Sequence, residues 1–167
     1  GVNNILNSNA SSLTIYTLMM LNGTEFKNPD FRKKYGYQTK FRIVPLNFGE
    51  YNGEKIFDFE EVGIATKDMP FDKYISLRAL ALLVESLHNG KPFYEFFKYA
   101  RSFKIEPGSL LKIMYENIKD SSPKIQSIMM NFVEETKNEL WDTEENLILN
   151  YKLEKNYRLL KEGKVGG

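Results

Sequence analysis

The first seventy residues carry the pattern of β-strands. Residues 13–21 are continuously apolar and β-prone, and such a run favours a strand buried on both faces, as in a parallel sheet. Two more strands are predicted over residues 39–46 and 55–65. Asn52-Gly53 lies between them, and both residues tolerate the positive φ angles of a tight hairpin turn. We therefore expect these two strands to form an antiparallel hairpin.

Helical patterns dominate the rest of the chain. Asn28-Pro29 opens a short helix that Gly36 closes, and a helix over 71–88 is apolar on nearly every side, so we expect it to be central and buried. A last helix is predicted from a cap at Asp142 or Thr143 through residue 160. Three further helices carry apolar stripes that we expect to lie in the core: Phe93, Phe96, Phe97, Ala100 and Phe103; Leu110, Leu111, Met114, Tyr115 and Ile118; and Ile125, Ile128, Met129, Phe132 and Val133.

These patterns predict an α+β fold, with a small N-terminal β region followed by a mainly α-helical bundle. The expected division is a β-rich segment over residues 1–69, a helical domain over 70–162, and a disordered tail over 163–167. The opening Gly1-Val-Asn-Asn-Ile-Leu6 has the character of the middle of a helix. We therefore expect the chain to be a piece of a longer protein.

Charge and cysteine content narrow the classes of function. The net charge is +1 with 27% charged residues, which indicates neither a nucleic-acid nor a membrane partner. The chain has no cysteine, and this excludes a disulfide framework, a thiolate metal site and a cysteine nucleophile. A cysteine-free chain fits a reducing cytoplasm, which is the expected location. No apolar run approaches the roughly eighteen residues of a membrane span.

Two acidic residues are the main candidates for polar chemistry. Glu60 and Glu61 are adjacent on a predicted strand, so their carboxylates face opposite ways. Such a pair can serve proton transfer, but charges on an edge strand that discourage aggregation are the favoured reading. Arg42 and Arg78 are candidate partners for an inward carboxylate. Arg78 lies on an otherwise apolar helix, so it is either paired or at the surface of the bundle.

The remaining polar candidates favour structural roles. His88 is the only histidine, and beside Asn89-Gly90 it is best explained by contacts with free carbonyls at a helix end. With one histidine, no cysteine and no calcium-loop spacing, no metal site is predicted. Four basic residues are interleaved with acids and favour a solvated face: Lys98, Arg101, Lys104 and Lys112.

Three blocks carry a resemblance to a known family. They are residues 16–25, 41–51 and 59–66, and in this order and spacing they resemble the C-terminal part of a radical S-adenosylmethionine (SAM) enzyme, of the subgroup that often carries a cobalamin-binding domain upstream. Leu21-Asn-Gly-Thr-Glu25 resembles the turn that follows a late strand of the half-barrel in this family, with Asn22 where proline is usual. The resemblance covers residues 13–80.

The resemblance implies a binding role without catalysis. In this family the main chain of the late strand lies along the adenine of SAM, which here implicates Met19, Met20 and Leu21, with Gly23 in the following turn. The family's reaction is reductive cleavage of SAM by a 4Fe-4S iron-sulfur cluster. That cluster requires three cysteines, which are absent here, so SAM and the cluster are implied only for a full-length protein. No catalytic residue is assigned, and the isolated chain is predicted to be inactive.

The implied partner is an upstream radical SAM domain of the same protein. Without it, the apolar edge at residues 13–21 would be exposed, and we expect it to fray, to pair with another copy or to refold against the helices. The alternative interpretation is a free-standing α+β protein-interaction module without catalysis. The substrate is not specified by any residue pattern.

Overall fold

The computed structural model describes residues 2–7, 10 and 12–166. The chain forms two compact units, one of Gly1–Tyr16 with Ile75–Val133 and the other of Thr17–Tyr74 with Glu134–Gly167. We call them the helical unit and the hairpin unit. These two units differ from the expected division near residue 69. The N-terminal residues belong with the helices and the C-terminal helices belong with the hairpin, because each supplies apolar side chains that its unit buries.

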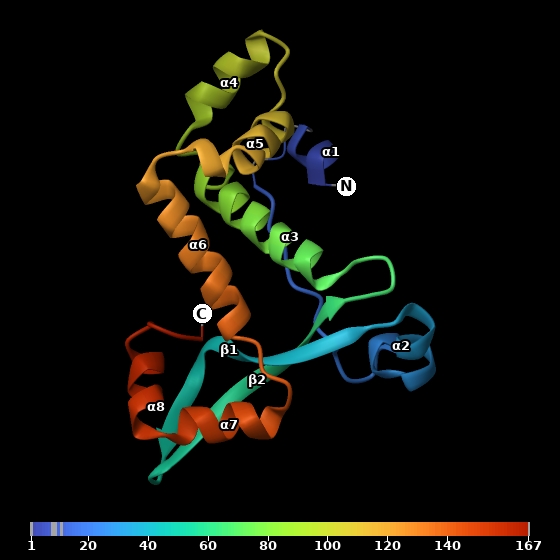
Figure 1. Ribbon diagram of the computed structural model, residues 1–167, viewed down its shortest axis with the longest axis vertical. Coiled ribbons are helices and arrows are strands. Elements are labelled where there is room, and N and C mark those ends of the chain that lie inside the picture. Colours follow the sequence, from blue (N-terminus) through green and yellow to red (C-terminus); the bar gives the residue numbers. More distant parts are fainter. Residues whose placement is uncertain (1, 8–9, 11, 167) are drawn as a thin grey trace. The chain divides into compact units, whose positions relative to one another are not determined.

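The hairpin is confirmed. β1 (Gln38–Tyr51) pairs antiparallel with β2 (Glu54–Ala65). The turn residues Asn52 and Gly53 have φ angles of 51° and 80°, as the turn requires. Helices accompany this two-stranded sheet (Figure 1), so the predicted α+β class is also confirmed.

A bulge divides β1. The register passes from Ile43 opposite Phe59 to Phe48 opposite Phe57, so the intervening residues of β1 have a single residue opposite them. Pro45 lies in this bulge, where its missing N–H removes no ladder hydrogen bond. The strand that we expected to end at residue 46 therefore resumes and continues to Tyr51.

Two C-terminal helices cover the hairpin. α7 (Glu144–Lys152) and α8 (Glu154–Lys161) lie against β1 and β2 (Figure 1). The Thr143 hydroxyl caps α7 by accepting from the N–H of Asn146 at 3.2 Å. The single last helix that we expected is in fact two, because Leu153 between them is extended. Beyond α8, the N–H of Lys164 donates to the carbonyl of Leu159 at 2.9 Å. The buried core comprises Ile43, Phe57, Leu147, Tyr151, Tyr157 and Leu160.

The open end of the hairpin carries short elements. A 3₁₀ turn (Glu25–Lys27) precedes α2 (Pro29–Tyr35). The Asn28 side chain caps α2 by accepting from two N–H groups, and Gly36 ends it at φ 63°. The predicted short helix is thereby confirmed. The N–H of Lys67 donates to the carbonyl of Tyr35 at 2.9 Å, which fastens α2 to the residues after β2.

The prediction of a strand over residues 13–21 is wrong. These residues are extended, but their one strand-like pairing is an isolated bridge between Met19 and Val62. Residue 11, before the segment, lies outside the described residues. Tyr16, Leu18, Met19 and Leu21 are exposed, so the run is not buried on both faces. The reason is that, among the described residues, β2 is the only strand that pairs with this segment, at Met19, whereas Leu13 and Ile15 pack against the core of the helical unit.

The helical unit contains the remaining elements. They are α1 (Val2–Asn7), most of α3 (Phe71–Leu83), a π-helix (Val84–His88), α4 (Tyr94–Ser102), α5 (Pro107–Glu116), a 3₁₀ turn (Ile118–Asp120) and most of α6 (Pro123–Asn138). Its core is formed by Leu6, Val84, Phe97 and Leu111. We expected the helix over residues 71–88, which corresponds to α3 and the π-helix, to be central and buried. Most of its apolar side chains are in fact only half-buried.

The apolar stripes are only partly core. On α4, Phe97 and Ala100 are buried, whereas Phe96 and the flanking Phe93 and Phe103 are exposed. On α6, Met129 is buried, whereas Ile125 and Ile128 are exposed. These are corrections to the predicted core, and they arise because each of these helices is packed on one narrow face within the described residues.

Candidate functional site

The segment that the resemblance implicates in SAM binding is docked on the end of β2. The N–H of Met20 donates to the carbonyl of Glu61 at 2.8 Å, and the N–H of Gly63 donates to the carbonyl of Leu18 at 2.8 Å. In this antiparallel geometry the residue between the two bonded positions directs its own N–H and C=O away from the partner strand. Met19 therefore presents a donor and an acceptor on the edge opposite β2.

A close approach of backbone to side chain permits this docking. Met20 is 3% exposed and lies over Gly63, where an added Cβ would stand 2.6 Å from Met20 Cε and 3.3 Å from Leu18 Cδ2. Only a residue without Cβ lets both side chains settle there undisturbed. Gly63 therefore fixes the distance between the docked segment and β2.

The turn after this segment forms a hydrogen bond with the carbonyl of Leu21. Gly23 has a φ of 80°, and the Thr24 hydroxyl donates to the carbonyl of Leu21 at 2.6 Å. Of the four residues predicted to contact SAM, the structure brings Met19, Met20 and Leu21 together and places Gly23 in the adjacent turn. Met20 N–H and Leu21 C=O are occupied, so the outward main-chain edge is that of Met19.

Glu61 anchors the turn and α2 to the same end of β2. The guanidinium of Arg32 donates to both of its carboxylate oxygens at 2.8 Å, and Lys27 Nζ donates to Oε2 at 2.5 Å. Burial by itself would raise the pKa of Glu61, but the hydrogen bonds from Arg32 and Lys27 outweigh it and lower the pKa to about 2. A carboxylate held ionised in this way is an anchor at neutral pH and not a proton donor.

Replacing Glu61 with Gln should loosen residues 24–37. We expect a loss of about 1–3 kcal/mol in unfolding free energy at pH 7, because Arg32 and Lys27 lose their partner but remain partly solvated. The pKa is lower in the folded chain, so the wild-type advantage should be complete above about pH 4.5 and disappear as the pH falls toward 2. Denaturant unfolding across this pH range measures it.

Glu54→Gln is the matched control, since Glu54 is an exposed residue of the same strand. It should leave stability unchanged at every pH. A constant difference between wild type and Glu61→Gln from pH 7 to pH 2 would contradict the low pKa.

Glu60 belongs to a second ionic network on the opposite face of β2. Arg42 Nε donates to Glu60 Oε1 at 2.6 Å, and Arg42 Nη1 donates to Glu139 Oε1 at 3.2 Å. All three side chains are largely buried. Burial alone would lower the pKa of Arg42, but the charges of Glu139 and Glu60 raise it above its ordinary value. The network joins both hairpin strands to the end of α6.

The carboxylates therefore face opposite ways, as predicted, and of the two candidate arginines it is Arg42 that pairs with Glu60. Both carboxylates were expected to be edge-strand charges that discourage aggregation, and the structure shows that both are ion-paired. Arg78 has a different setting in the helical unit, with its guanidinium carbon 5.9 Å from the centre of the Phe132 ring.

Sequence reasoning missed Lys27, Arg32 and Glu139. Lys27 and Arg32 precede Glu61 by 34 and 29 residues, and Glu139 follows Arg42 by 97 residues. The α2 signals could have placed Arg32 near the hairpin end. No local pattern near Glu139 indicates its partner.

The structure also bears on metals and membranes. Within the described ranges no three side chains of His, Asp or Glu are grouped so that they could hold a metal ion, and the absence of cysteine leaves no thiolate for an iron-sulfur cluster. The helices found between residues 2 and 166 are each too short or too polar to cross a bilayer.

The comparisons with known proteins give no relative. A scan with protein-family models finds no match to this chain, and a search of curated proteins finds none either.

Proposed function

We propose that this chain is the C-terminal part of a radical SAM enzyme, which supports binding of SAM and substrate but is not catalytic alone. The observation that carries the proposal is the outward main-chain edge of Met19. This edge lies within the motif block that resembles the family, at the position where the resemblance implies contact with SAM. Iron-sulfur chemistry would be supplied by an upstream domain.

The geometry of the segment supports this role. Leu18 and Met20 are bonded to β2, so the strand is fixed in place. On its other edge Met19 offers one N–H and one C=O, beside the exposed Met19 and Leu21 side chains. An apolar segment with an unpaired main-chain edge is a liability in an isolated protein, as an edge strand is. An upstream domain with SAM at its border would cover that edge.

The Glu61 anchor supports it as well. The Glu61 carboxylate is in β2, and its partners Lys27 and Arg32 both follow the turn after Leu21. Fixing both the strand and the turn preorganises the main chain, and preorganisation lowers the free-energy cost of binding a ligand. Within this proposal Glu61 is a positioning residue that does not contact SAM.

Met19→Pro tests the proposed edge. Proline removes the outward N–H of Met19 and replaces its exposed side chain, and edge strands tolerate proline where the N–H faces away from the partner. In the isolated chain we expect unchanged hydrogen-exchange protection of Gly63. In the protein that includes the upstream domain, SAM affinity measured by calorimetry should fall about tenfold, as for loss of one buried hydrogen bond.

Met20→Pro is the matched control, because it removes the N–H that is bonded to Glu61. It should reduce protection at Gly63 in the isolated chain. Unchanged SAM affinity in Met19→Pro, with a folded protein, would rule out the outward edge as a contact with SAM or with the domain that binds it.

The alternative is a free-standing interaction module, and the exposed rings of α4 favour it. Phe93, Phe96 and Phe103 are about half or more exposed, at 49%, 47% and 60%, and aromatic side chains are enriched at protein interfaces. Two results together would select this alternative: a coding sequence with no upstream Cys-x-x-x-Cys-x-x-Cys loop, and no effect of Met19→Pro on SAM binding.

A further inference from the structure

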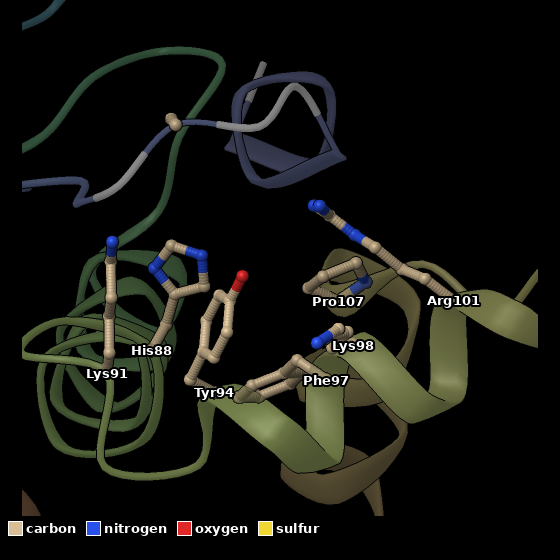
Figure 2. Close-up of a pocket in the computed structure, with 8 residues that line it drawn as sticks. His88, Lys91, Tyr94, Phe97, Lys98, Arg101 and Pro107 are labelled. Carbon is tan, nitrogen blue, oxygen red and sulfur yellow. The ribbon is translucent and has the colours of Figure 1, made fainter.

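A basic pocket lies within the helical unit, and it uses no residue of the SAM-binding proposal. Its volume is about 300 Å³, which is within the range of small-molecule sites. Figure 2 shows His88, Lys91 and Tyr94 side by side, with Arg101 reaching in from the other side. The lining residues are Ala10, His88, Lys91, Tyr94, Phe97, Lys98, Arg101 and Pro107.

The backbone before α4 places two of these side chains. The π-helix ends at His88, and its wider turn is closed by the N–H of Asn89 donating to the carbonyl of Val84 at 3.0 Å. Gly90 and Lys91 then both have positive φ angles, 65° and 58°. A lysine in this region is uncommon and is held there by its surroundings. The result is that the Lys91 ammonium stands 5.6 Å from the centre of the Tyr94 ring.

Four further lining residues come from one face of α4. Tyr94, Phe97, Lys98 and Arg101 are spaced at three and four residues, so they share a face of the helix. Lys98 Nζ is 6.0 Å from the centre of the Tyr94 ring, so the ring has an ammonium group near it from both Lys91 and Lys98. Phe97 meets the His88 ring edge-on at 6.1 Å.

The pocket has a positive lining. No acidic side chain is among the lining residues. Lys98 and Arg101 form ion pairs with Glu95 at 3.6 Å and with Glu106 at 3.7 Å, and both distances exceed that of a good hydrogen bond. Arg101 is oriented by the carbonyl of Leu6, to which its Nη2 donates at 3.3 Å. The basic residues expected on a solvated face are thus partly gathered into one site.

We propose that this pocket binds a small phosphorylated molecule that carries a flat ring. Lys91, Lys98 and Arg101 match a phosphate dianion, since ammonium and guanidinium groups form strong charge-assisted hydrogen bonds with phosphate oxygens. The Tyr94, Phe97 and His88 rings supply flat surfaces for the remainder of the ligand. Tyr94 contributes to the flat surfaces through its ring, and its hydroxyl is directed into the pocket (Figure 2).

Titration with phenyl phosphate tests the proposal on the whole chain. This probe has the dianion and the ring but no adenine, so the Met19 edge does not contribute to its binding. By calorimetry we expect phenyl phosphate to bind at least about tenfold more tightly than inorganic phosphate or phenol. Amide shifts in NMR spectra should change at residues 88–101.

Lysine variants identify the site. Lys91→Met and Lys98→Met should each weaken phenyl phosphate binding about tenfold, the loss expected for one charge-assisted hydrogen bond. Lys112→Met is the matched control, because Lys112 is an exposed lysine of α5 that pairs with Glu116. It should bind as the wild type does. All three positions are exposed, so folding is expected to survive, and far-ultraviolet circular dichroism checks this.

Three outcomes would overturn the proposal. Equal losses in Lys112→Met and Lys91→Met would reveal unspecific charge attraction. Inorganic phosphate binding as tightly as phenyl phosphate would exclude a ring-bearing ligand. Tighter binding of a polyglutamate peptide than of phenyl phosphate would assign the pocket to an acidic protein segment instead.

Discussion

Replacing Arg42 with Met is expected to lower the unfolding free energy of the hairpin unit by about 3–5 kcal/mol. Arg42 is the cation between Glu60 and Glu139, at 2.6 Å and 3.2 Å. Methionine fills much of the same volume but leaves two carboxylates in a largely buried site. Their repulsion and their lost hydrogen bonds both act against the folded state, so the effect exceeds that of removing an ordinary ion pair.

Lys40→Met is the control for this prediction. Lys40 lies two residues earlier in β1 and pairs with Asp142, whose side chain is 78% exposed. A solvated pair of this kind contributes about 0–1 kcal/mol. Denaturant unfolding of both variants gives the comparison. Equal losses in the two would show that burial of the Arg42 network does not govern its contribution.

The elements that the sequence predicted correctly are those with local signals. Asn52-Gly53 determines the hairpin through two positive φ angles, and Asn28-Pro29 with Gly36 determines α2 through its two caps. In each case the residues that decide the structure are adjacent in sequence. Arg42 was one of two candidate partners for an inward carboxylate, and it pairs with Glu60 because the two stand directly opposite each other in the hairpin register.

The elements that it did not predict depend on contacts between distant segments. An apolar run such as residues 13–21 signals burial, but not whether a partner is present on both sides. The stripe on α4 has helical spacing, yet only Phe97 and Ala100 are covered, since coverage depends on which helices the chain brings alongside. The assignment of α7 and α8 to the hairpin also has no local cause. It follows from their fit to the apolar face around Ile43 and Phe57.

The same distinction applies to the candidate sites. Adjacent carboxylates on a strand point to opposite faces, so the separation of Glu60 from Glu61 follows from the period of a strand. The positions of Arg32, which pairs with Glu61, and of Glu139, which pairs with Arg42, do not follow from that period. Tertiary packing brings both residues to the hairpin. In the basic pocket the spacing along α4 predicts the shared face of Tyr94 and Lys98, whereas Lys91 joins them only through the left-handed backbone after the π-helix.

Leu147→Ala should destabilise the hairpin unit by about 2–5 kcal/mol, through lost burial and the cavity left behind. Leu147 is fully buried, at 0% exposure, in the core that α7 shares with β1 and β2. Hydrogen exchange followed by mass spectrometry measures the loss segment by segment. Leu149→Ala on the same helix is the control, because Leu149 is 65% exposed and its truncation should change stability by less than about 0.5 kcal/mol.

Leu111→Ala completes the test in the helical unit, where Leu111 is likewise fully buried. If the two units have separate cores, Leu147→Ala should accelerate exchange in β1 and β2, and Leu111→Ala should accelerate it in α5 and the π-helix. Each variant should leave the other unit's protection nearly unchanged, because mutations without shared contacts act independently. Equal acceleration of both units by either variant would instead show that the chain opens as one cooperative body, since a cavity in one core would then cost the other its protection.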